Sequence, residues 1–282
     1  MNAILLISVI FGITVQNVAK KIYNKTSPAP GAYLFTTLSS LAAVIFFLLT
    51  SKGLSFSASV LPYSIAFAAA YTTAIVGSTV AISCGSLSIT SLIISFSLIL
   101  PTLYGLIFLK DPISIGFFPA FALLILSLFL INKKEKEVKI NAKWVVSVTL
   151  SFLGNGCCTI FQKMQQSAFE GSYKNKFMIV ALAITTAFSL VMMLIKERKD
   201  LKKQPLPAYG AGVVCGLFNG AVNLFVMILT GRMVVSLMFP IISAGGIVAT
   251  YFVSKLIYKE TLTRPQLLGF LLGTVSVILF NL

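Results

Sequence analysis

The sequence KDPISIGFFPAFALLILSLFLIN at residues 110–132 has a counterpart at residues 259–281, KETLTRPQLLGFLLGTVSVILFN. Each stretch begins with a lysine and an acidic residue and continues as an apolar run to an asparagine, 21 residues beyond the acid. A run of this length is about one helical crossing of a lipid bilayer. The recurrence indicates that the chain holds two copies of one membrane unit.

The composition indicates a membrane location. Hydrophobic residues make up 57% of the 282 residues and charged residues 10%, and the mean hydropathy is +0.97. An average soluble domain is about 25% charged. At roughly 20 residues per crossing, the chain has room for about ten helices and little else. We therefore expect an all-α protein of the cell membrane, with the lipid bilayer around it and no separate catalytic module.

The predicted helices are separated by short segments rich in Pro, Gly and charged residues. They cover residues 2–20, 31–51, 61–83, 87–109, 113–131, 143–164, 175–195, 207–230, 232–254 and 264–281. The first run follows Met1 without a basic segment or a convincing cleavage site, so we expect a retained helix. A charged linker at 133–142 divides the chain into two predicted five-helix repeats, residues 1–132 and 143–282.

Two internal spacings agree between the halves. The spacing between Tyr63 and Gly85 recurs between Tyr209 and Gly231, 146 residues later in the chain. The spacing between Gly12 and Lys21 recurs between Gly154 and Lys163, at an offset of 142 residues. Because each unit has an odd number of crossings, the second must enter the membrane from the opposite side. The predicted architecture is therefore ten transmembrane helices as two inverted repeats.

This arrangement resembles the drug/metabolite transporter superfamily, and specifically its ten-helix EamA-like members. The matching residues are Lys110-Asp111 with Pro112 and Ile113, and Lys259-Glu260-Thr261-Leu262-Thr263 with Gln266, Leu268 and Gly269. The first copy departs from the family pattern, with Asp in place of Glu and Pro after it. The resemblance implies a carrier that works by alternating access, with a central cavity lined by the first, third, fourth, sixth, eighth and ninth helices.

The basic residues bear on orientation. Of the 22 Lys and Arg residues, 16 lie in the loops after the first, third, fifth, seventh and ninth helices. Since basic loops favour the cytoplasmic side, this count places both termini outside the cytoplasm, whereas the family resemblance implies cytoplasmic termini. Both orientations stay open. The net charge of +15 comes from these short clusters and does not indicate nucleic-acid binding.

Polar side chains at membrane depth are costly unless they are paired or face water, so each cluster is a candidate binding site. Asn219 and Asn223 are four residues apart, on one face of a predicted helix. Their amides suit zwitterions, sugars or nucleobases, although hydrogen bonding between packed helices explains them equally well. The candidate substrate-binding residues are Gln16, Asn17, Tyr71, Thr72, Ser95, Asn155, Gln162, Asn219, Asn223, Ser243 and Tyr251.

Four residues in the fourth and ninth predicted helices are candidate hinges for gating. They are Pro101, Pro240, Gly245 and Gly246, and close packing explains the glycines as well. Lys21 and Lys163 are equivalent in the repeat. They either attract an anionic substrate or extend to the membrane interface.

The sequence offers little for catalysis. There is no His, no Asp or Glu in the middle of a predicted helix, and no metal-ligand or disulfide spacing among the four cysteines. We expect no enzyme activity, no cofactor and no metal, and no tight proton coupling through an intramembrane carboxylate. A multidrug carrier that exports cations would need an acidic residue within the membrane to bind them, so the absence of such a residue from the predicted helices also disfavours that function.

The sequence favours a secondary transporter that moves a small polar metabolite, such as an amino acid, by alternating access. The alternative is a channel-like or lipid-handling membrane protein. A channel predicts a continuous polar stripe and a lipid-handling protein a groove open to lipid, whereas the amides here cluster near mid-helix. The partners expected are the small-molecule substrate and the bilayer. Two repeats permit a complete cavity in a monomer, and a homodimer is equally compatible.

Overall fold

The computed structural model describes residues 2–51, 57–108, 115–131, 141–170, 172–230, 235–259 and 262–279. Its α-helices are α1 (Asn2–Thr26), α2 (Ala32–Thr50), α3 (Leu61–Cys84), α4 (Leu87–Ser95), α5 (Ile99–Phe108), α6 (Phe117–Ile131), α7 (Ala142–Ala168), α8 (Lys174–Lys196), α9 (Leu206–Thr230), α10 (Val235–Tyr258) and α11 (Arg264–Leu279). Three 3₁₀ segments are η1 (Ala58–Val60), η2 (Phe96–Leu98) and η3 (Arg198–Lys203). The described residues contain no strand, which confirms the predicted all-α class.

Within the described ranges, seven helical segments are long and apolar enough to cross a membrane. They are Asn2–Thr26, Ala32–Thr50, Ala58–Cys84, Ala142–Ala168, Lys174–Lys196, Leu206–Leu229 and Ile241–Tyr258. The other three predicted crossings fall on α4 with α5, on α6 and on α11, and each extends into residues outside the described ranges. Most of the predicted linker, residues 133–140, also lies outside them.

The first helix is longer than predicted. Its helical conformation continues past residue 20 through Lys21 and Lys25 to Thr26, just before Ser27 and Pro28. Lysine has a flexible apolar stem that can extend along a helix, so a lysine cluster does not end one. Pro28 lacks the backbone N–H group that a further helical hydrogen bond would need, which favours an end before it. Lys20 is therefore an internal position of α1 and not its end.

Contacts between α1 and α3 show that these two helices run parallel. Gln16 of α1 and Tyr71 of α3 both hydrogen-bond to Asn219, so they lie at one level. Further along both helices, Asn24 donates to the backbone carbonyl of Thr79 over 2.9 Å. The contacts advance in the same direction along the two chains.

The helix α9 runs in the opposite direction to α1. Gly12 lies against Val222, and Gln16, one turn later in α1, contacts Asn219, which is earlier in α9. The close approach depends on the missing side chain of Gly12, since a Cβ there would lie 2.5 Å from Val222 Cγ2.

The helix α7 likewise runs opposite to α3. A Cβ at Gly77 would lie 2.7 Å from the carbonyl oxygen of Ser147, and one at Gly154 would lie 2.7 Å from that of Ala70. The two backbones are therefore nearly in contact, a packing that small residues permit between membrane helices. We call the four helices that these contacts join, α1, α3, α7 and α9, the core helices, although the buried apolar cluster extends from them into α2 and α8.

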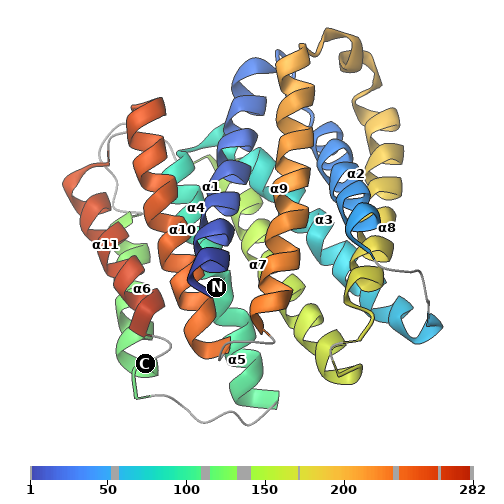
Figure 1. Ribbon diagram of the computed structural model, residues 1–282. Coiled ribbons are helices and arrows are strands. Elements are labelled where there is room, and N and C mark those ends of the chain that lie inside the picture. Colours follow the sequence, from blue (N-terminus) through green and yellow to red (C-terminus); the bar gives the residue numbers. More distant parts are fainter. Residues whose placement is uncertain are drawn as a thin grey trace.

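Two outer helix pairs flank this core on opposite sides (Figure 1). On one side α2 and α8 are joined by hydrogen bonds from Thr37 to Ser189, 3.0 Å, and from Thr186 to Ser40, 2.8 Å. On the other side, α6 packs along α11. The helices α4, α5 and α10 lie between this second pair and the core (Figure 1).

The predicted helix over residues 87–109 is interrupted by the 3₁₀ segment η2. Pro101 explains the break, because it lacks an N–H group and its ring would clash with the carbonyl of Ser97 in a regular helix. The neighbouring helix α7 holds the segment in place: Asn155 Nδ2 donates to Ser97 Oγ over 2.7 Å, and Gly156 leaves room for Leu100. The candidate hinge Pro101 thus lies at a real break in helical structure.

Candidate functional site

Five of the eleven candidate substrate-binding residues meet in one hydrogen-bonded cluster, which we call the amide network. Its members are Gln16, Tyr71, Gln162, Asn219 and Asn223. They come from all four core helices, α1, α3, α7 and α9. Sequence spacing alone predicted that Asn219 and Asn223 share a face of one helix, and the structure places both in the network.

Asn219 is the central member. Its Oδ1 accepts from Tyr71 Oη over 3.0 Å and from Asn223 Nδ2 over 3.2 Å. Its Nδ2 donates to Gln16 Oε1 over 3.0 Å. Asn223 in turn accepts from Gln162 Nε2 over 3.1 Å. One asparagine therefore links α1 and α3, and its neighbour extends the link to α7.

The network keeps hydrogen-bonding capacity that no described residue uses. Gln162 Oε1 has no donor among the described residues, and it is not among their fully buried unsatisfied atoms. The side chains of Gln16, Gln162, Asn219 and Asn223 are all partly exposed, although they lie between four helices. An amide group offers both donors and an acceptor. The network can thus bind a small polar molecule as well as join helices.

Two candidate residues bond elsewhere. Thr72 donates to the carbonyl of Ala68 in its own helix over 2.7 Å and lies 3.3 Å from Thr185 Oγ1 of α8. Asn17 donates to Thr250 Oγ1 of α10 over 3.3 Å. The hydroxyl of Thr72 is satisfied by its own helix, as is usual for threonine within a helix. Both residues join a core helix to an outer one.

Three further candidates lie around the helix break. Asn155 holds Ser97, as described above, and Ser243 Oγ of α10 donates to the backbone carbonyl of Ser95 over 3.2 Å. The hydroxyl of Ser95 itself bonds within α4. These contacts tie α4 and η2 to α7 and α10, one on each side. Within the described part of the chain, no hydrogen bond connects these three residues to the amide network.

The remaining candidates lie in α10. The ring of Tyr251 packs against Phe270 of α11 at 4.8 Å between centroids. The backbone of α10 continues as regular helix through Pro240. Gly245 lies against Ile10 of α1, and a Cβ at Gly246 would be 3.5 Å from a side chain of α1. In this conformation the glycines are close-packing positions, and α10 shows no break comparable to that at Pro101.

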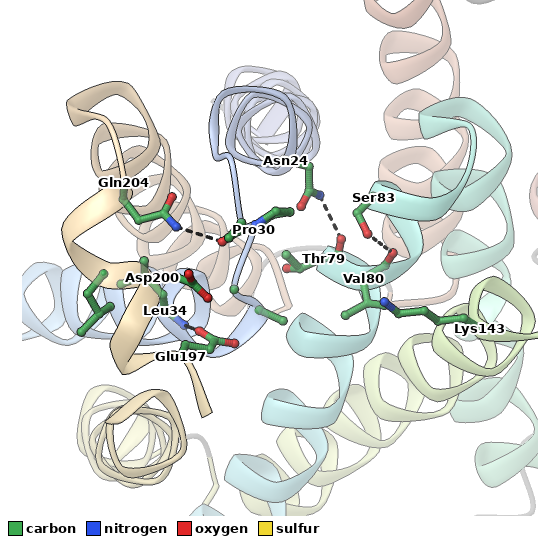
Figure 2. Close-up of a pocket in the computed structure, with 14 residues that line it drawn as sticks. Asn24, Pro30, Leu34, Thr79, Val80, Ser83, Lys143, Glu197, Asp200 and Gln204 are labelled. Carbon is green, nitrogen blue, oxygen red and sulfur yellow. Dashed lines mark hydrogen bonds between the residues drawn. The ribbon is translucent and has the colours of Figure 1, made fainter. Parts of the chain in front are cut away.

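A pocket of about 350 Å³ opens at one end of the bundle, where α1 and α3 end and α2 and α7 begin (Figure 2). Its polar lining includes Asn24, Thr79, Lys143, Glu197, Asp200 and Gln204. Figure 2 shows Asn24 and Thr79 reaching toward each other from α1 and α3. Sequence analysis selected none of these residues, and it placed Asn24 beyond the first predicted helix, which ended at residue 20.

The acidic groups of this pocket are already paired. The carboxylate of Glu197 accepts from the backbone N–H groups of Tyr33 and Leu34, over 3.1 and 2.8 Å, at the start of α2. Such an anion stabilises the positive end of the helix dipole. Asp200 forms a 3.0 Å ion pair with Lys203. Neither acid therefore leaves an unpaired negative charge in the pocket.

The described residues hold no group of three or more His, Cys, Asp or Glu side chains that could bind a metal ion. All four cysteines are free thiols. Cys215 of α9 and Cys158 of α7 are buried in the core. The polar chemistry of the amide network comes from amide groups and the hydroxyl of Tyr71.

No protein-family model and no curated protein matches the sequence. The fold does match solved structures, 28 chains in all. One, described only as "Crystal structure of protein", has a TM-score of 0.66 at 12% identity, and the match covers 99% of this chain and 95% of that one. At this identity the likeness shows the fold alone: nearly the whole chain follows an architecture already seen by experiment.

Proposed function

We propose that this chain is a secondary carrier for a small polar metabolite, such as an amino acid. It would work by alternating access between two inverted five-helix halves, as the resemblance to EamA-like members of the drug/metabolite transporter superfamily implies. The amide network is the proposed substrate site. The observation that carries the proposal is that this network joins residues from both halves.

The position of the network suits a carrier. Gln16 and Tyr71 come from residues 1–132, and Gln162, Asn219 and Asn223 come from residues 143–282. A site at the boundary between two repeats changes its exposure when one half rocks against the other. The four helices that supply it are all candidate membrane spans.

The helix directions support an inverted duplication. The repeat offsets make α7 the equivalent of α1, and α9 the equivalent of α3. The helices α1 and α3 run parallel to each other, and α7 and α9 run opposite to them. The contacts are also reciprocal, since α1 packs on α9 and α7 packs on α3. A duplicated unit inserted from the opposite side of the membrane gives this reversal.

The test is transport by purified protein in proteoliposomes loaded with pooled amino acids, nucleobases and sugars. Asn219→Leu removes the central member of the network, and we expect it to abolish counterflow of the transported pool. Thr186→Val is the matched control, because it removes an interhelical hydrogen bond between α2 and α8, away from the network.

Folding is checked by size-exclusion chromatography and thermal unfolding of both variants. If Asn219→Leu folds and its counterflow is unchanged, the amide network only joins helices, and the proposal that it binds substrate is refuted. Flux that does not saturate in the native protein would favour the channel-like alternative.

A further inference from the structure

The side chain of Lys20 belongs to the interior of the bundle. Lys20 follows Gln16 by four residues in α1 and precedes Asn24 by four, so the three side chains lie along one face of the helix. Gln16 is in the amide network and Asn24 lines the pocket at the end of the bundle. The face therefore carries a polar line from the network, through an ammonium group, to the pocket.

Contacts with α9 place Lys20 next to the network. Cys215 is buried and lies four residues before Asn219 in α9. Since Gln16 bonds to Asn219, the same antiparallel register that joins Gln16 to Asn219 brings Lys20 to Cys215. Four residues advance about 6 Å along a helix, so the two contacts are roughly one turn apart.

Lys20 has no ion-pair or hydrogen-bond partner among the described residues. The carboxylates nearest to this end of the bundle are engaged, Glu197 by the start of α2 and Asp200 by Lys203. Lys25, in the last turn of the same helix, lies over the ring of Tyr258 at 4.5 Å from the centroid. A partly buried ammonium group without a counter-ion is costly, and an anionic ligand would remove the cost.

The repeat gives a second, independent reason to place Lys20 at the site. At the offset of 142 that pairs Gly12 with Gly154, the equivalent of Lys20 is Gln162. Gln162 is a member of the amide network and carries its open acceptor. Equivalent positions of two inverted repeats face the same central space. One half thus presents an amide there, and the other presents a cation.

We propose that Lys20 binds the carboxylate of the transported substrate while the amide network binds its remaining polar groups. This inference rests on the proposed carrier function and narrows its substrate to small carboxylic acids, with amino acids and hydroxy acids of similar size as the best fit. An ammonium group and a set of amides about one helical turn apart match a molecule with a carboxylate at one end and an amino or hydroxyl group that the amides can hydrogen-bond at the other.

The experiment compares amino acids with their carboxamides, which keep the size and the amine but lack the negative charge. Counterflow in proteoliposomes is measured for the native protein, Lys20→Gln and Lys20→Arg, with Lys25→Gln as a control that removes a charge from the same helix. In the native protein we expect carboxylates to compete at least tenfold better than their carboxamides. Lys20→Gln loses this preference, Lys20→Arg keeps most of it, and Lys25→Gln keeps all of it.

A carboxylate preference that is unchanged in folded Lys20→Gln protein would overturn the inference while leaving the carrier function intact. If the native protein transports none of the pools, the carrier function is refuted, and the role of Lys20 is then tested by ligand binding.

The binding test measures the thermal unfolding temperature of native and Lys20→Gln protein in detergent, with the amino-acid pool or the carboxamide pool added. Stabilisation by the carboxylates in native protein but not in Lys20→Gln supports an anion site, and equal behaviour of the two proteins refutes it.

Discussion

Gln162 of α7 donates a 3.1 Å hydrogen bond to Asn223 of α9, and this contact connects the sixth predicted helix to the eighth. Asn223 also donates to the backbone and side chain of Asn219, which extends the connection to α1 and α3. Through these two asparagines, all four core helices share one hydrogen-bonded group. The loss of any one side chain therefore removes a hydrogen bond between two of these helices or within α9.

Unequal effects are expected within the network. Asn219→Leu leaves Tyr71 and Gln16 without their hydrogen-bond partner in the network, whereas Tyr71→Phe removes a single hydroxyl. A buried polar group left unpaired costs about 1–3 kcal/mol, so Asn219→Leu should destabilise the protein more than Tyr71→Phe and abolish transport. Tyr71→Phe should weaken substrate affinity only several-fold. Thermal unfolding and counterflow measure the two effects, and equal losses in both variants would contradict the central role of Asn219.

The contact between α7 and α3 should not tolerate a side chain at Gly154. A Cβ there would be 2.7 Å from Ala70 O and from Ala74 N, both backbone atoms. We expect Gly154→Ala to destabilise the protein by about 1–3 kcal/mol, as overpacking does.

Gly210 of α9 is the matched control, because nothing lies within 4 Å of a Cβ at that position. Gly210→Ala should be neutral or stabilising by up to about 1 kcal/mol, since alanine favours the helix. Thermal unfolding in detergent compares the two variants. If Gly154→Ala unfolded at a temperature no lower than that of Gly210→Ala, the inferred close packing of α7 on α3 would be wrong.

The break at η2 should matter for the rate of transport. Pro101→Ala restores the N–H group and removes the ring clash, which favours a continuous helix by up to about 3 kcal/mol. If the break serves as a hinge, the exchange rate should fall while substrate affinity changes little. Pro265→Ala is the control, because Pro265 lies in the first turn of α11, where a missing N–H group is not needed. An unchanged exchange rate in Pro101→Ala would argue against a hinge at this proline.

Glu197 should contribute to stability as the cap of α2. Its carboxylate accepts from two backbone N–H groups, and Gly31 at the N-cap offers no side chain. We expect Glu197→Ala to cost about 1–2 kcal/mol, the usual effect of losing a helix cap. Asp200→Ala breaks only the exposed pair with Lys203 and should cost less than about 1 kcal/mol. Thermal unfolding of both variants tests the difference, and an equal loss would show that Glu197 is no more than a surface charge.

Much of this arrangement was accessible from the sequence, because helical spacing is local. The four-residue spacing of Asn219 and Asn223 predicts a shared face without knowledge of any other helix. Which residues meet that face depends on how each helix is rotated and paired, which spacing does not determine. Thus Gln162 was selected for its polarity, while its bond to Asn223 needed the structure.

The errors have physical reasons too. The first predicted helix ended at residue 20, so the position of Lys20 within a longer α1 and the role of Asn24 in the pocket were missed. The signal was present, since Gln16, Lys20 and Asn24 recur at intervals of four residues. At Pro101 the prediction named a bend but kept one helix, whereas the structure has a 3₁₀ segment just before the proline.

The proposed carrier function is tested most directly by counterflow of the native protein in proteoliposomes preloaded with unlabelled pooled amino acids. Labelled amino acids added outside should accumulate transiently above equilibrium, with a rate that saturates as their concentration rises. This overshoot requires a site that is exposed to one side at a time. Uptake that never exceeds equilibrium and rises linearly with concentration, or no uptake by folded protein from any pool, would contradict a carrier.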